Sequence, residues 1–264
     1  MKYIDIHCHI NFPDYDSDLD QVIDRAKKDE IGIIIVGTDI ESSKKAVEIA
    51  IKYENIYSDI WATVAIHPDH AKDGFDFSII EDLAKNKKVI GIGECGLDYL
   101  HSKEEEIDKQ KEIFIKHIEL ANRLDKPLML HIRNSKNNNS NTALFAYGVA
   151  IDILKKYSKV RSNFHFFAGN MDDLKNVLAI DATVSLTGVL TFTRDYDEIV
   201  KNVPNTHIMS ETDAPYVSPI PYRGKRNEPS FVKEVVKAIA SIKGEGMEKT
   251  GLQTVDNARK MFRI

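Results

Sequence analysis

Two histidines near the start of the chain have a spacing that suits a shared metal ion. His7 and His9 close the first apolar run, Tyr3-Ile4-Asp5-Ile6. In an extended strand, side chains at positions i and i+2 point to the same face, so both imidazoles can reach one cation. A chance pair of histidines on a surface strand is the plain alternative, and the pair alone does not separate the two interpretations.

Further residues of metal-ligand type stand at the ends of other apolar runs: Glu94, His131, His165 and Asp213. With the first two histidines they supply four imidazoles and two carboxylates, which exceeds the need of one tetrahedral ion and suits two divalent ions sharing a bridging carboxylate. Mixed nitrogen and oxygen ligands suit Zn, Mn, Fe or Co and tolerate Mg, so we expect two divalent ions of the Mg, Mn or Zn type. Taken singly, His131 and His165 fit hydrogen-bonded core histidines and Asp213 fits a turn former, but that interpretation needs a coincidence at five strand ends.

The elements that would position these residues follow a regular alternation of apolar, β-branched runs and amphipathic, charge-rich segments. The runs predict strands at residues 3–8, 32–37, 60–66, 89–93, 127–132, 163–167, 182–186 and 207–211. The segments between them predict helices at residues 18–28, 41–53, 77–85, 104–124, 143–157, 171–180, 195–200 and 229–242, with a ninth near the C-terminus.

Eight βα units with near-continuous apolar strands predict an α/β fold in which a parallel sheet closes as a (β/α)8 TIM barrel. No linker divides the 264 residues, so we expect a single domain over residues 1–264 with an extra C-terminal helix. An open doubly wound sheet is the alternative, but His7 and His9 stand where such a fold would carry its glycine-rich fingerprint. In a barrel the strand ends meet at one rim, so the ligand-type residues should converge there.

Charge limits the type of partner. The formal net charge of −5 argues against wholesale wrapping of nucleic acid, whereas a local basic loop can still grip a few phosphates. Arg223-Gly224-Lys225-Arg226 follows the eighth predicted strand and has the required character, because the forked guanidinium of arginine suits phosphate oxygens. A solvated charge run, or a loop in which Arg226 pairs with Glu228, is an equal alternative.

Composition also bears on location. Every apolar run is interrupted by charge well short of the roughly 18 residues that span a bilayer, and the N-terminus does not resemble a signal peptide. The only cysteines are Cys8 and Cys95, for which core packing is favoured over a ligand or nucleophile role. We therefore expect a cytoplasmic protein, or a nuclear one in a eukaryote, with no membrane association and no obligate protein partner.

The motifs match one family in order and spacing. They lie at residues 5–9 (Asp-Ile-His-Cys-His), 65–68 (Ala-Ile-His-Pro), 91–99 (Gly-Ile-Gly-Glu-Cys-Gly-Leu-Asp-Tyr), 131–133 (His-Ile-Arg), 165–169 (His-Phe-Phe-Ala-Gly), 211–216 (Glu-Thr-Asp-Ala-Pro-Tyr) and 221–229 (Pro-Tyr-Arg-Gly-Lys-Arg-Asn-Glu-Pro). Over nearly its whole length the sequence resembles the TatD family of metal-dependent deoxyribonucleases, part of the amidohydrolase-like barrel superfamily.

The resemblance implies a nuclease that hydrolyses DNA phosphodiester bonds with divalent metal, in several members as a 3′ to 5′ exonuclease. Carried over by position, one ion would be held by His7, His9 and Asp213. The other would be held by His131 and His165, with Glu94 as the bridge. Asp213 could also accept the proton of the attacking water.

In family terms His67 and Arg133 resemble residues that contact the substrate or support the ligands from behind. The basic character of the loop makes Arg223, Lys225 and Arg226 the candidates for binding substrate phosphate. The remaining histidines are expected to be ordinary surface or packing residues: His70, His101, His117 and His207.

This sequence departs from the family pattern at three places. Phe166 stands where Cys is common and Ala168 where Ser is common, and the asparagine-rich stretch at residues 134–141 lengthens the loop after Arg133. That stretch is predicted to be a flexible loop, with a tolerated insertion favoured over a substrate-contacting lid. Two other functions stay open: a hydrolase of the same superfamily acting on a phosphotriester, an amide or a D-aminoacyl-tRNA ester, and a non-enzymatic nucleic-acid-binding barrel.

Overall fold

Eight parallel strands form the centre of the computed structural model, which describes residues 1–135 and 145–264. The strands are β1 (Tyr3–Cys8), β2 (Ile31–Val36), β3 (Ile60–Val64), β4 (Val89–Asp98), β5 (Leu128–Arg133), β6 (Ser162–Phe164), β7 (Thr183–Leu186) and β8 (Ile208–Ser210). Each strand pairs in parallel with the next along the chain. This order is the one that sequential βα units produce in a barrel.

The barrel closes between β1 and β8. Cys8 forms a parallel bridge with Ala214, just beyond the end of β8, and the backbone N–H of His9 donates to the carbonyl oxygen of Ala214 at 2.7 Å. Deeper in the barrel, the hydroxyl of Ser210 donates to the carbonyl oxygen of Ile4 at 3.0 Å. The predicted TIM barrel is confirmed.

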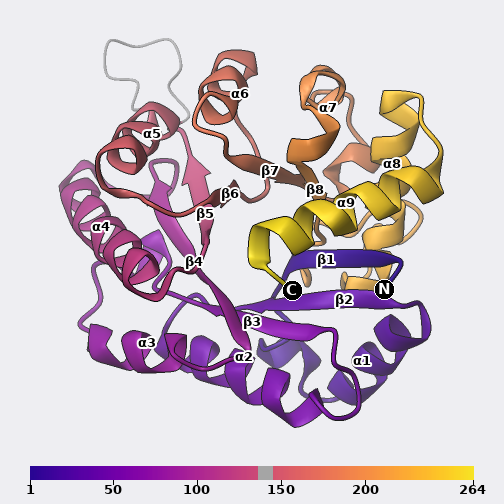
Figure 1. Ribbon diagram of the computed structural model, residues 1–264, viewed down its shortest axis with the longest axis horizontal. Coiled ribbons are helices and arrows are strands. Elements are labelled where there is room, and N and C mark those ends of the chain that lie inside the picture. The colour runs from indigo at the N-terminus through magenta and orange to yellow at the C-terminus, as the bar shows by residue number, and fades with distance from the viewer. Residues whose placement is uncertain (136–144) are drawn as a thin grey trace.

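Helices surround the strands (Figure 1). They are α1 (Leu19–Lys28), α2 (Ile40–Tyr53), α3 (Phe77–Ala84), α4 (Ile107–Leu124), α5 (Ala146–Tyr157), α6 (Met171–Leu178), α7 (Asp197–Asn202), α8 (Val232–Lys243) and α9 (Met247–Phe262). Local chemistry starts several of them: Asp39 and Asn170 form capping boxes at the beginnings of α2 and α6. The predicted helices are present with small shifts, and 3-10 turns at residues 104–106 and 229–231 precede α4 and α8.

One strand is longer than predicted. β4 was expected to end at Gly93, yet it continues to Asp98, and its register against β5 shifts between Ile92 and Cys95. The shift puts Glu94 inside the strand on the barrel interior. Glycine is required at position 93, because a Cβ atom there would lie 2.4 Å from the Cβ and carbonyl oxygen of Met129. The hydrophobic run alone carries no sign of such a bulge.

Another strand is shorter than predicted. β6 ends at Phe164, so His165 and Phe166 lie in the segment that follows it. Phe166 has a φ of 41°, a left-handed backbone conformation that a strand does not contain. Phe166 therefore leaves the sheet at the rim, while the backbone N–H of His165 still donates to the carbonyl oxygen of Leu130 in β5 at 3.0 Å.

The extra C-terminal helix closes one end of the barrel. Inward-facing Ile4, Ile34 and Met209 pack with Val255 and Phe262 of α9 in a separate buried cluster. Figure 1 shows α9 lying across this end, beside both chain termini. The opposite end stays free for the strand ends that carry the ligand-type residues.

Other expectations concern single features. Cys8 and Cys95 are both buried and unpaired, consistent with core packing. In the described part of the chain, no helix has both the length and the apolar character that crossing a bilayer requires. Most of the asparagine-rich stretch, residues 136–141, lies outside the described residues.

Candidate metal centre

The seam between β1 and β8 brings the first three predicted ligands together. The backbone N–H of Asp213 donates to the carbonyl oxygen of His7 at 2.9 Å. The Oδ1 atom of Asp213 lies 3.8 Å from Nε2 of His7 and 3.5 Å from Nε2 of His9. Residues more than two hundred positions apart in the chain thus share one small volume.

The two imidazoles at this seam face one another with their Nε2 atoms 3.1 Å apart. The Nδ1 atom of His9 donates to the carbonyl oxygen of Val36 at 3.0 Å. In the neutral ring, the Nε2 atom of His9 then carries a lone pair that can bind a metal ion. Four-coordinate ions with bonds of about 2.1 Å separate their ligand atoms by about 3.4 Å, close to the distances seen here. The donor set therefore fits a divalent cation between His7, His9 and Asp213.

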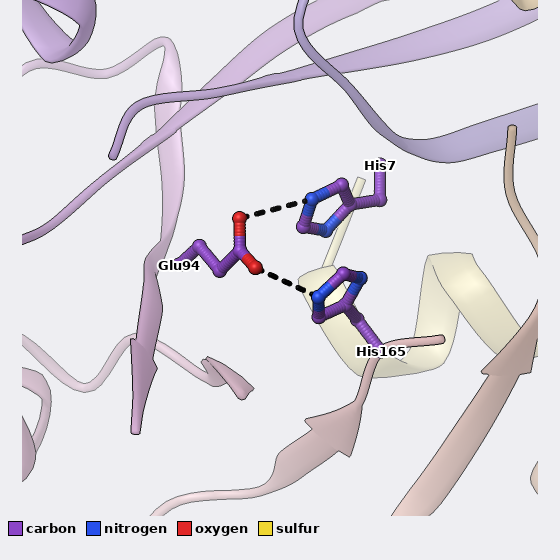
Figure 2. A group of neighbouring side chains, drawn as sticks. All are labelled: His7, Glu94 and His165. Atoms are coloured by element: carbon purple, nitrogen blue, oxygen red, sulfur yellow. Dashed lines mark ion pairs between the residues drawn. The ribbon is translucent and has the colours of Figure 1, made fainter. Parts of the chain in front are cut away.

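Glu94 joins this group to a second one (Figure 2). Its Oε2 atom lies 3.3 Å from Nε2 of His7, and its Oε1 atom lies 2.8 Å from Nε2 of His165. The Oε1 atom is also 2.8 Å from Nδ1 of His131, which is 3.3 Å from Nε2 of His165. Each carboxylate oxygen faces a different pair of imidazoles, so Glu94 has the geometry of a bridging ligand. All six predicted ligands converge at one rim of the barrel.

The electrostatics keep both carboxylates ionised. Burial alone would raise the pKa of Glu94, but the surrounding imidazoles, His165 foremost, hold it well below its usual value. Burial would likewise raise the pKa of Asp213, and its hydrogen bond with His9 and the neighbouring imidazoles lower it instead. Two anionic carboxylates among imidazoles are the donor set that binds a divalent cation.

His67 lies next to the cluster and groups with Glu94 and His131. Its Nδ1 atom accepts the backbone N–H of Asp69 at 3.2 Å, so in the neutral ring Nε2 carries the hydrogen. That Nε2 lies 3.5 Å from Oε1 of Glu94. Burial, and then the charge of His131, lower the pKa of His67 and favour this neutral form. The ring is thus arranged as a hydrogen-bond donor at the edge of the metal centre.

A cavity of about 280 Å³ opens over the cluster. His67 and Arg133 line it, as do the aromatic side chains of Phe12, Phe166 and Tyr216. His70, interpreted from the sequence as an ordinary surface residue, also lines this cavity. A small polar group can therefore reach the ligand atoms from solvent past aromatic walls.

The basic loop after β8 divides into two parts. Arg226 makes a bidentate pair with Asp18 at 2.8 and 2.7 Å, and its guanidinium lies 4.2 Å from the ring centre of Tyr15. Glu228, the partner considered from the sequence, instead accepts a bidentate pair from Arg25. Arg226 therefore ties the loop to the start of α1.

Arg223 and Lys225 are the more exposed members of the loop. Arg223 packs its guanidinium 4.0 Å from the ring centre of Phe192 and donates to the carbonyl oxygen of Ser218 at 2.9 Å. Among the described residues, neither of them nor Arg226 is part of the cavity lining. Contact with a bound phosphate would need a substrate that extends beyond the cavity.

Two carboxylates that sequence reasoning passed over contact the predicted ligands. Oδ2 of Asp98 lies 3.0 Å from Nε2 of His131, and Oε1 of Glu211 lies 3.2 Å from Nδ1 of His165. Both are buried acidic residues in strand-like apolar context, and that placement is the signal that could have identified them. Of the other histidines, His101 lies against Oδ2 of Asp98 at 2.9 Å. His117 is buried and accepts the backbone N–H of Ile66, and His207 pairs with Asp181 at the surface.

Comparisons with known proteins identify the family. The family described as "TatD related DNase" matches residues 4–263. An uncharacterised metal-dependent hydrolase, YabD of Bacillus subtilis, is 35% identical over 267 residues, 98% of each chain. The 3′-5′ ssDNA/RNA exonuclease TatD of Erwinia billingiae is 31% identical over 272 residues, again 98% of each chain.

Solved structures agree on the fold. The TatD homologue YjjV of Escherichia coli superposes with a TM-score of 0.85 at 20% identity, covering 100% of this chain and 98% of that one. A TatD family hydrolase from Entamoeba histolytica gives a TM-score of 0.84 at 22% identity, covering 99% and 98%. Because the family match extends over almost the entire sequence, this chain belongs to the TatD family of metal-dependent hydrolases.

Proposed function

We propose that this protein is a deoxyribonuclease that hydrolyses DNA phosphodiester bonds with two divalent metal ions, acting from the 3′ end. The observation that carries the proposal is the position of the Glu94 carboxylate between the two groups of imidazoles. Its Oε2 atom faces His7, and its Oε1 atom faces His131 and His165. Two adjoining ions on a shared carboxylate are the arrangement that stabilises both the attacking and the leaving oxygen in phosphoryl transfer. The name of the Erwinia billingiae relative, an ssDNA/RNA exonuclease, supports a nucleic-acid substrate.

The protein's own residues have distinct tasks in this scheme. Divalent ions in the centre would supply an activated water and neutralise charge on the phosphate. Asp213, ionised and at the rim, would serve as the acceptor for the proton of an attacking water. His67 donates from Nε2 to a phosphate oxygen, and Arg133 in the cavity wall supplies a positive charge beside it.

Substrate outside the cavity would meet the loop that follows β8. Arg223 and Lys225 are exposed there and can contact the neighbouring phosphates of a strand. Arg226, already bonded to Asp18, contributes by holding the loop in place. The acidic character of the whole chain, with a net charge of −5, favours such a small local contact over extended wrapping.

The test uses metal-free protein reloaded with Mg²⁺, Mn²⁺ or Zn²⁺ and a 5′-labelled single-stranded DNA. A ladder that shortens from the 3′ end is expected, and a 3′-blocked oligonucleotide should resist. His7→Ala, Glu94→Ala and Asp213→Ala should remove metal-stimulated release, while His207→Ala, far from the centre, is the matched control. Undiminished nuclease activity in the three purified ligand variants would contradict the proposal.

The same preparations separate the alternatives. A panel containing a phosphotriester, an amide and a D-aminoacyl-tRNA ester should be turned over more slowly than DNA. Faster turnover of any of these would assign the centre to a different hydrolase reaction. Metal content near zero, with DNA binding unchanged by a chelator, would instead indicate a non-enzymatic binding protein.

A further inference from the structure

The four imidazoles of the centre are supported unequally. His131 and His165 each direct their second nitrogen at a buried carboxylate, Asp98 and Glu211. At the seam, His9 directs its second nitrogen at the neutral carbonyl oxygen of Val36. The buried Nδ1 of His7 has no hydrogen-bond partner among the described residues. The two halves of the centre thus differ in what holds their imidazoles.

Asp98 is fixed independently of its contact with His131. Its Oδ1 atom accepts the backbone N–H groups of Leu100 at 2.8 Å and His101 at 2.9 Å. Its Oδ2 atom is then left facing Nε2 of His131 and Nδ1 of His101. With one oxygen held by the backbone, the other is free to accept from the imidazole, so a metal ion on Nδ1 of His131 would leave the hydrogen of the ring on Nε2, facing Asp98.

Glu211 is fixed in a comparable way. Its Oε1 atom accepts the backbone N–H of Phe166 at 2.8 Å, and its Oε2 atom accepts the hydroxyl of Ser185 at 2.5 Å. The hydroxyl of Ser185 in turn accepts from Nδ2 of Asn163 at 2.9 Å. A metal ion on Nε2 of His165 would therefore leave the hydrogen of the ring on Nδ1, facing Oε1 of Glu211.

We propose that Asp98 and Glu211 are positioning residues that hold His131 and His165 in opposite tautomers and thereby strengthen metal binding at that half of the centre. A carboxylate behind a ligand imidazole fixes its orientation and makes its free nitrogen a stronger donor to the metal. The loss of such a partner typically weakens metal affinity by about 10- to 100-fold. The proposal concerns the metal centre and does not depend on DNA being the substrate.

Two substitutions remove the support without removing a ligand. Glu211→Gln keeps an oxygen for Phe166 and His165 and removes the charge, since the hydroxyl of Ser185 can rotate to accept from the amide. Asp98→Asn leaves one oxygen for the backbone N–H groups and turns an amide N–H group toward Nε2 of His131. Both should weaken one of two metal-binding steps by about 10- to 100-fold, with the other step unchanged.

Matched controls leave both carboxylates and the bonds that fix them in place. His101→Ala removes the second imidazole on Asp98, and His207→Ala changes a histidine that pairs with Asp181 at the surface. The assay is a competition titration of metal-free protein with a chelating dye, using Zn²⁺ and Mn²⁺. The controls should bind both ions with nearly wild-type affinity.

Nitrogen-15 spectra of the zinc-loaded wild-type protein give a second readout that needs no variant to fold. They should show the remaining hydrogen on Nε2 of His131 and on Nδ1 of His165.

The reverse assignment for either ring would overturn the proposal, as would wild-type affinity at both sites in Glu211→Gln and Asp98→Asn. Equal weakening of both sites together with a lowered melting temperature would show a general structural role and would also overturn it. If the two variants bind metal more weakly but the wild-type protein shows no nuclease activity, this proposal holds and only the proposed function is wrong.

Discussion

The backbone N–H of Asp213 donates a 2.9 Å hydrogen bond to the carbonyl oxygen of His7, across the seam where the barrel closes. This bond sets the depth of Asp213 relative to the two histidines of β1. A one-residue slip between β1 and the segment after β8 would turn the carboxylate away from the imidazoles, because side chains alternate along a strand. The ligand group at the seam is therefore a direct product of barrel closure.

We expect Asp213→Ala to lower metal-stimulated hydrolysis by more than about 100-fold. Loss of a group that only supports a ligand already costs about 10- to 100-fold, and Asp213 contacts both imidazoles of the seam itself and is the proposed proton acceptor. Steady-state kinetics on a labelled oligonucleotide measure the effect. The melting temperature serves as the control for folding, and activity within tenfold of wild type would argue against a ligand role.

Metal binding should stabilise the folded protein. A ligand at 100 times its dissociation constant adds about 2.7 kcal/mol to the free energy of unfolding when it binds only the folded state. Thermal melts with and without a chelator should show this shift in the wild type and in His207→Ala. Glu94→Ala should lose most of it, because both halves of the centre share Glu94. An equal shift in Glu94→Ala would place the bound metal elsewhere.

Two cations of the basic loop, Arg226 and Lys225, should respond differently to removal. Arg226→Ala is expected to cost about 1 kcal/mol of stability, since it breaks a bidentate pair with Asp18. Lys225→Ala should leave the melting temperature unchanged, weaken DNA binding, and reduce the slope of log affinity against log salt by about one. Chemical denaturation and binding titrations at several salt concentrations test both statements. A stability loss for Lys225→Ala equal to that of Arg226→Ala would contradict this division.

Acid should destabilise the fold through His117. Burial lowers the pKa of His117 to about 4, and its Nε2 accepts the backbone N–H of Ile66 at 3.0 Å. The unfolded chain, with an ordinary value near 6.5, takes up the proton first, so stability is complete above pH 6.5 and declines as the pH falls towards 4. At about 1.4 kcal/mol per pH unit, the loss is roughly 3 kcal/mol.

The measurement is urea unfolding between pH 4 and 7 of the wild type and of His117→Gln, which keeps an acceptor for Ile66. Other titrating groups contribute equally to both proteins, so the difference between the curves isolates His117. The variant should show a flatter profile by roughly the amount stated above. Parallel profiles would mean that His117 is protonated at no cost in the folded state.

Much of the architecture was predictable from local pattern. The eight apolar runs and the helices between them follow spacings of two and of three to four residues, which depend only on near neighbours. The six ligand-type residues were recognisable because each ends or follows such a run. The bulge at Glu94 and the turn at Phe166 were not, because both arise where one segment packs against another.

The sequence by itself determined which residues could bind metal and that alternating strands and helices would bring them to one rim. Only the tertiary structure decided how they are divided: that Glu94 turns one oxygen to each half, that Asp98 and Glu211 stand behind His131 and His165, and that Arg226 bonds to Asp18. The physical reason is the range of each interaction. Periodicity acts over a few residues, whereas hydrogen bonds and ion pairs join atoms about 3 Å apart in space, wherever they lie along the chain.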